Sequence, residues 1–87
     1  MPFLELHTVK GLLSPEQKRY LMEKFSDLLV EVEGGGDSDF RKTVWIKIDE
    51  CEASGWRIGE WWPTEEAVAR HVEAREAMRK AAPGAQQ

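Results

Sequence analysis

The alternation of hydrophobic and polar residues divides the chain into a strand, a helix, a second strand and a second helix. Residues 3–9 form a short run rich in apolar and β-branched side chains, which predicts a strand that ends before Gly11. A second strand is predicted over residues 41–49, where the pattern has a period of two. Its two faces carry Val44, Ile46 and Ile48 on one side and Trp45, Lys47 and Asp49 on the other.

The segment between the two strands predicts a helix with a well-defined start. Ser14 is suited to the N-cap, Pro15 to the first helical position, and Gln17 completes a capping box. Three consecutive glycines at residues 34–36 predict the end of the helix. The apolar side chains expected on one helix face are Leu21, Phe25, Leu28, Leu29 and Val32.

Strand, helix and strand joined by short connections predict a right-handed βαβ unit with parallel strands, in the α/β (α+β) class. Two parallel strands and one helix are too few to form a stable sheet protein alone. We therefore expect the sheet to be completed by further copies of the chain, in a homo-oligomer.

The remainder of the chain predicts an irregular segment and a helix. Residues 52–63 favour a small hairpin and contain three of the four tryptophans, which either seal an interface between subunits or line an active-site pocket; both can hold. Thr64 is suited to the N-cap of a helix over residues 65–80. Residues 81–87 are expected to be disordered. This pattern divides the chain into a βαβ domain, residues 1–62, and a C-terminal helix with its tail, residues 63–87.

Composition limits the classes of function. Eighty-seven residues predict one domain. Twelve basic and 16 acidic residues give a net charge of −4, which argues against nucleic acid as a partner. No signal peptide is recognised, and no apolar run reaches the roughly 20 residues of a membrane span. A single cysteine, Cys51, offers neither an internal disulfide nor a metal constellation, so a reducing, cytoplasmic location fits best.

Pro2 has the most distinctive chemistry, because it follows Met1 directly. Aminopeptidases generally remove an initiator Met that precedes Pro, which would leave the secondary amine of Pro2 as the first group of the chain. An ordinary α-amino group titrates at about 7.7–8.0, and burial in an apolar site lowers its pKa. A base with a pKa near the working pH suits proton transfer. Because a strand is predicted to follow, we expect this amine to occupy a fixed place.

Several short motifs, taken in their order, resemble the 4-oxalocrotonate tautomerase family. They are Pro2 opening a strand, Gly11, the helix start Ser-Pro-Glu-Gln-Lys at residues 14–18, the strand at residues 44–50, and the turn Gly-Trp-Arg-Ile-Gly at residues 55–59. The resemblance spans residues 2–59. It implies a βαβ fold, a catalytic N-terminal proline and no metal or organic cofactor. It also implies assembly into a hexamer built from dimers, with a dimer or a trimer as alternatives.

The chain departs from that family at both arginines that bind the substrate's carboxylates. The first matching position is Leu12, or Leu13 if the extra loop residue is placed earlier, and the second is Trp45. Trp56 matches the aromatic residue that shapes the family's apolar pocket. Replacement cations offered by the sequence are Lys10, Arg41, Lys42, Lys47 and Arg57. Of these, Arg57 lies best in sequence, beside Trp56, although a surface arginine in a cation–π contact is an equal interpretation.

Together with the basic amine, the resemblance implies a tautomerase in which Pro2 is the general base. The predicted substrate is a 2-oxo or enol acid, less anionic and more aromatic or apolar than the dicarboxylates of the family. The substrate-binding residues are predicted to be Trp45, Trp56, Arg57, Lys10 and Leu12. The alternative is a catalytically inactive oligomer of the same fold that acts as a binding or scaffold protein.

Other polar residues carry no predicted chemistry. His7 lies in the first strand and His71 on the last helix, and each is interpreted as a packed or surface histidine. Glu5, Asp49 and Glu50 are interpreted as charges at the sheet edge or in solvent.

Overall fold

The computed structural model describes residues 2–81 and contains two strands and two long helices. Short 3-10 helices, η1 and η2, precede and follow the second strand. The elements in chain order are β1 (Phe3–Val9), α1 (Pro15–Val32), η1 (Ser38–Thr43), β2 (Trp45–Cys51), η2 (Ala53–Gly55) and α2 (Glu65–Ala81). The chain is therefore a mixed α+β protein, as predicted.

The chain forms two compact units, each described by itself. The first unit comprises Met1–Thr8 and Leu13–Glu50, and the second comprises Val9–Leu12 and Cys51–Gln87. This grouping follows spatial contacts, so the division between residues 1–62 and 63–87 stays a prediction.

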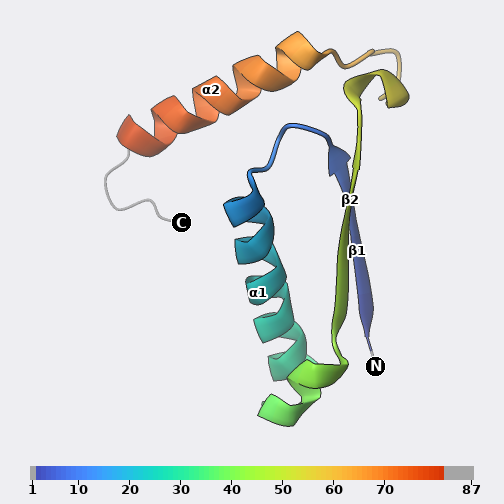
Figure 1. Ribbon diagram of the computed structural model, residues 1–87, viewed down its shortest axis with the longest axis vertical. Coiled ribbons are helices and arrows are strands. Elements are labelled where there is room, and N and C mark those ends of the chain that lie inside the picture. The colour runs from blue at the N-terminus through green and yellow to red at the C-terminus, as the bar shows by residue number, and fades with distance from the viewer. Residues whose placement is uncertain (1, 82–87) are drawn as a thin grey trace. The chain divides into compact units, whose positions relative to one another are not determined.

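In the first unit, β1 and β2 lie side by side and run parallel in a two-stranded sheet (Figure 1). The pairing begins where the Trp45 N–H donates to the Pro2 carbonyl at 3.0 Å. Side chains alternate between the two faces of a strand. Leu4 and Leu6 of β1 are half-buried, as are Ile46 and Ile48 of β2, whereas the side chains between them are mostly exposed.

The start of α1 is the predicted capping box. The Ser14 hydroxyl accepts a hydrogen bond from the Gln17 N–H at 3.1 Å, and the Gln17 side chain accepts one from the Ser14 N–H at 2.9 Å. Pro15 occupies the first helical position. The two bonds satisfy backbone donors that a helix start otherwise leaves unpaired.

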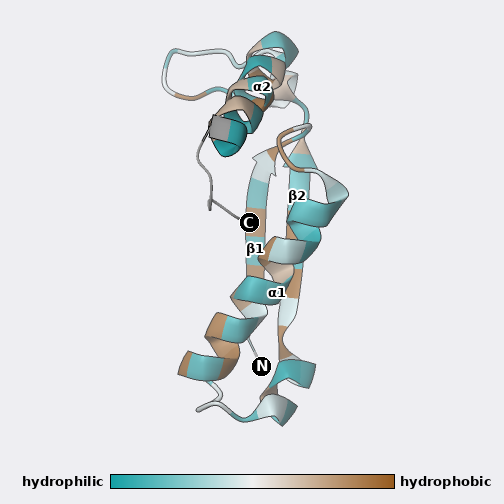
Figure 2. Ribbon diagram, turned by 90° about the vertical axis from the view of Figure 1, so that its left-hand side faces the viewer, coloured by the Kyte–Doolittle hydropathy of each residue, from teal (hydrophilic) through white to brown (hydrophobic). Residues whose placement is uncertain are grey.

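The packed face of α1 differs from the predicted one. Leu21, Phe25 and Leu29 are half-buried, as expected, but Leu28 and Val32 are 56% and 76% exposed. The half-buried positions recur at residues 17–18, 21–22, 25–26 and 29–30, so the side that packs is turned away from Leu28 and Val32. Figure 2 shows hydrophobic and hydrophilic segments alternating along β1 and α1.

The second strand begins later than predicted. Residues 41–43 belong to η1, because the Asp37 carboxylate caps this 3-10 helix by accepting from the Asp39 N–H at 3.0 Å. Arg41 then binds α1 through Asp27 at 2.7 Å and Glu23 at 2.6 Å. The strand starts only at Trp45, after these contacts end, and extends to Cys51.

The second unit contains η2, a tight turn and α2. Ile58 and Trp61 exchange two backbone hydrogen bonds of 3.0 Å across a tight turn, in which Gly59 takes a positive φ of 65°. This is an isolated β-bridge in the segment where a small hairpin was expected. The Thr64 hydroxyl accepts from the Ala67 N–H at 3.1 Å, so Thr64 caps α2 as predicted.

The prediction of a disordered tail over residues 81–87 can be compared with the structure only at residue 81. Ala81 is the last residue of α2 and so is not part of a disordered tail, and residues 82–87 lie outside the described range. Neither long helix that the structure describes has the length and apolar character needed to cross a bilayer.

The capping box predicts a measurable contribution to stability. Ser14→Ala removes the side-chain acceptor of the Gln17 N–H and should lower the free energy of unfolding by about 1 kcal/mol. Urea denaturation at matched protein concentration would show this as a lower midpoint with an unchanged slope. Ser54→Ala is the matched control, since Ser54 is exposed and makes no side-chain hydrogen bond among the described residues. Equal losses for the two variants would show that the cap contributes nothing.

Candidate functional site

Pro2 and Trp45 lie together at the start of the sheet. Pro2 is half-buried directly before β1, and its carbonyl accepts the 3.0 Å hydrogen bond from the Trp45 N–H. Trp45 is 58% exposed and Phe3, the first residue of β1, is 59% exposed. The structure thus places the predicted base on an ordered backbone, next to an exposed aromatic side chain.

The other four predicted site residues lie in the second unit. The backbone N–H of Lys10 donates to the Cys51 carbonyl at 2.8 Å, and the indole Nε1 of Trp56 donates to the same oxygen at 3.2 Å. One carbonyl therefore holds Lys10 and Trp56 in the same neighbourhood. The Leu12 carbonyl accepts from Arg75 of α2 at 2.8 Å.

The guanidinium of Arg57 stacks on an aromatic ring. It lies 4.8 Å from the centre of the Trp62 ring, within the range of a cation–π contact. This is the alternative interpretation of Arg57 offered by the sequence. A carboxylate substrate would have to share Arg57 with Trp62.

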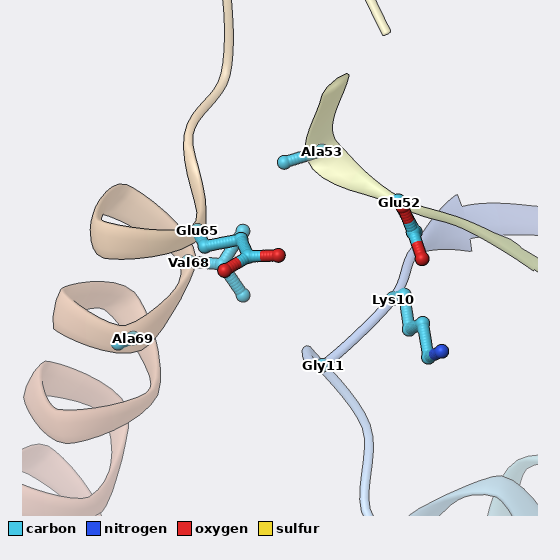
Figure 3. A pocket seen from close by; sticks show the side chains of 7 residues that line it. All are labelled: Lys10, Gly11, Glu52, Ala53, Glu65, Val68 and Ala69. Atoms are coloured by element: carbon cyan, nitrogen blue, oxygen red, sulfur yellow. The ribbon is translucent and has the colours of Figure 1, made fainter. Parts of the chain in front are cut away.

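Lys10 borders a cleft of about 330 Å³ in the second unit (Figure 3). Figure 3 shows Glu65 and Val68 extending from the start of α2 into this cleft. One lysine and two glutamates line the cleft, so a ligand with two negative charges would meet more repulsion than attraction. Its lining residues are Lys10, Gly11, Glu52, Ala53, Glu65, Val68 and Ala69.

Leu12 lines a second cleft of the same unit, of about 270 Å³. Val68 borders both clefts, so they are neighbours. The wall of the second cleft is mainly apolar, with His71 as its most polar side chain. Its lining residues are Val9, Leu12, Ile58, Trp61, Pro63, Ala67, Val68 and His71. Such a wall suits an apolar or aromatic group.

Three of the five cations suggested by the sequence are engaged by acidic partners. The hydrogen bond from Arg41 to Asp27, and to a lesser extent the one to Glu23, raise the pKa of the guanidinium above its usual value. Lys42 pairs with Asp39 at 3.4 Å. Lys47 pairs with Asp49 at 3.6 Å and Glu5 at 3.9 Å. Lys10 and Arg57 differ from these three, because neither has an acidic partner within the described part of the chain.

One group of polar residues was missed by sequence reasoning. Glu5 and His7 of β1 and Asp49 of β2 gather on the sheet face that carries Trp45. The spacing of two residues between Glu5 and His7 was the available signal, since it puts both side chains on one face of a strand. The contribution of Asp49 depends on which residues of β1 and β2 lie opposite each other, which the sequence does not specify.

No family model matches the sequence, and no curated protein or solved structure shows significant similarity to it.

Proposed function

We propose that the protein is a cofactor-independent tautomerase in which Pro2, after removal of Met1, is the general base. The observation that supports this proposal most directly is the placement of Pro2. Its carbonyl is held by the Trp45 N–H, so the nitrogen of the same residue belongs to an ordered part of the sheet. Pro2 is half-buried, and burial favours a neutral, proton-accepting amine.

The proposed reaction moves one proton. The Pro2 amine takes a proton from a carbon next to a carbonyl, or from an enol oxygen, and returns it to a more distant carbon of the same molecule. Negative charge develops on the substrate oxygen between the two steps. A cation or a backbone N–H directed at that oxygen would stabilise it. Lys10 has no acidic partner among the described residues, but it lies eight residues beyond Pro2 along extended chain, about 26 Å away. We therefore propose that a lysine in this role comes from a neighbouring copy of the chain.

The proposed substrate is a 2-oxo or enol acid with an aromatic or apolar group and one carboxylate. Leu12 borders an apolar cleft, and Lys10 borders the neighbouring cleft, which two glutamates also line. Trp45 offers stacking and desolvation but no charge. These features favour a monoanion over a dianion. The substrate-binding roles of Trp45, Trp56, Arg57, Lys10 and Leu12 are part of this proposal.

We also propose that the working form is a homo-oligomer, with a hexamer favoured and a dimer or trimer as alternatives. In the first unit, the described side chains of the sheet and of α1 are at most half-buried. Phe3, Trp45, Leu28 and Val32 are more than half exposed in the single chain. Contact with other copies would remove this apolar surface from water.

A second candidate function is a non-catalytic binding or scaffold protein. It is supported by the pairing of Arg41, Lys42 and Lys47 with acidic side chains, which leaves few cations for an anionic substrate. It is also the expected outcome if Met1 is retained, because acylation of the Pro2 nitrogen abolishes its basicity.

The role of the amine predicts the effect of Pro2→Ala. The variant retains a primary amine but loses the rigid secondary amine, so turnover of a phenylenolpyruvate-type enol should fall by roughly 10²–10⁴-fold. The measurement is kcat/KM for ketonisation, followed by ultraviolet absorbance, on protein without an N-terminal tag. Intact mass must show loss of Met1 in both proteins, and light scattering must show the same assembly for both. Equal rates under these conditions would remove Pro2 from the mechanism, and a wild-type mass that includes Met1 would favour the scaffold function.

The loss of the family's arginines predicts a substrate preference. A monocarboxylate aryl enol should be turned over with a higher kcat/KM than 2-hydroxymuconate, because Trp45 cannot pair with a second carboxylate. Trp45→Arg should shift this ratio toward the dicarboxylate by roughly tenfold to a hundredfold, the contribution of one charged hydrogen bond. Trp45→Phe, which keeps an aromatic ring without charge, should leave the preference in place. A wild-type protein that clearly prefers the dicarboxylate would contradict the proposed substrate class.

A further inference from the structure

A cluster of ionisable side chains occupies the exposed face of the β1–β2 sheet. The His7 Nε2 lies 3.3 Å from the Glu5 Oε1, and the His7 Nδ1 lies 3.8 Å from the Asp49 Oδ2. The side chains of His7, Glu5 and Asp49 are 57%, 38% and 40% exposed, so the cluster is open to solvent. None of these residues takes part in the proposed tautomerase reaction.

The parallel pairing of the strands creates this cluster. Glu5 and His7 are two residues apart on β1 and therefore project from the same face. Asp49 projects from β2, which lies about 4.8 Å away as the hydrogen-bonded neighbour. The three side chains stand on ordered backbone and converge from two directions. One ligand atom from each lies within 4.8 Å of the other two.

We propose that Glu5, His7 and Asp49 form a binding site for one divalent transition-metal ion, with Zn²⁺ as the best match. One imidazole nitrogen and two carboxylate oxygens form a mixed nitrogen and oxygen ligand set. This set suits Zn²⁺, whereas Ca²⁺ and Mg²⁺ prefer oxygen ligands alone. Three protein ligands leave at least one coordination position for water or a ligand. The proposal departs from the sequence-based prediction that the chain has no metal site.

The two carboxylates of the cluster already attract one cation, the ammonium of Lys47. Its ammonium lies 3.6 Å from the Asp49 Oδ2 and 3.9 Å from the Glu5 Oε2. These separations exceed the length of a good hydrogen bond, so the ammonium is attracted by the carboxylates without binding tightly to either oxygen. A metal ion would compete with this ammonium for the same two carboxylates.

Removal of Lys47 distinguishes a metal site from an ordinary surface ion-pair network. If the cluster only pairs charges, Lys47 is one of its partners and its removal creates no binding. If the cluster is a metal site, Lys47 is a competing cation and its removal strengthens metal binding. The two interpretations therefore predict opposite results for the same variant.

The test is isothermal titration calorimetry of the full-length, tag-free protein with ZnCl₂, after removal of metals by a chelator. The wild-type protein should bind one ion per chain at Glu5, His7 and Asp49. Glu5→Gln, His7→Asn and Asp49→Asn should each weaken binding by roughly tenfold or more. His71→Asn removes the only other histidine of the chain and is the matched control, so its affinity should stay unchanged.

Lys47→Gln should tighten binding by roughly thirtyfold, the effect of removing one unit charge about 4 Å from a doubly charged ion in a water-like medium. Circular dichroism of each variant checks that the fold is retained. Because the readout is equilibrium binding, the result does not depend on whether the protein is a tautomerase, and Pro2→Ala should bind Zn²⁺ as the wild type does. Absence of binding at millimolar Zn²⁺, or equal affinity for the wild type and the three ligand variants, would overturn the proposal.

Discussion

The backbone pairing of β1 with β2 is the interaction on which the other features depend. It begins with the hydrogen bond from Trp45 to Pro2 and continues past the sheet to the one from Lys10 to Cys51. The first bond places the predicted base beside an aromatic residue. The second brings Lys10 to the carbonyl that also receives the Trp56 indole. Between them, the same pairing sets Asp49 next to Glu5 and His7. A shift of one residue in this pairing would turn Asp49 to the opposite face.

The sequence predicted those elements that depend on local signals. The capping box at Ser14 and Gln17 and the N-cap of α2 at Thr64 both follow from side chains within one helical turn. The late start of β2 was missed, since it depends on Asp37 capping a 3-10 helix and on Arg41 bridging to α1. Periodicity also misplaced Leu28 and Val32, because it identifies an apolar stripe without showing which part of that stripe packs.

The candidate site was predictable to a lesser degree. Pro2 and Trp45 were identified from their positions in the sequence, and the structure brings them together through one hydrogen bond. The ranking of cations was not predictable, because ion pairs depend on which acidic groups lie nearby in space. Arg57 proves to be stacked on Trp62, and neither Arg57 nor Lys10 has an acidic partner among the described residues. The grouping of Glu5, His7 and Asp49 likewise required the strand pairing.

The central claim of this account is that the chain completes its sheet and covers its apolar surface only in a homo-oligomer. One helix packs with the two strands, and Phe3 and Trp45 project from the sheet more than half exposed. Two strands are fewer than an independently stable sheet usually needs. Sedimentation equilibrium at micromolar concentration, with circular dichroism of the same samples, measures assembly and folding together. The account predicts a mass that is a multiple of 10.0 kDa, with folded structure lost when the assembly dissociates. A monomer of 10.0 kDa that stays folded would contradict it.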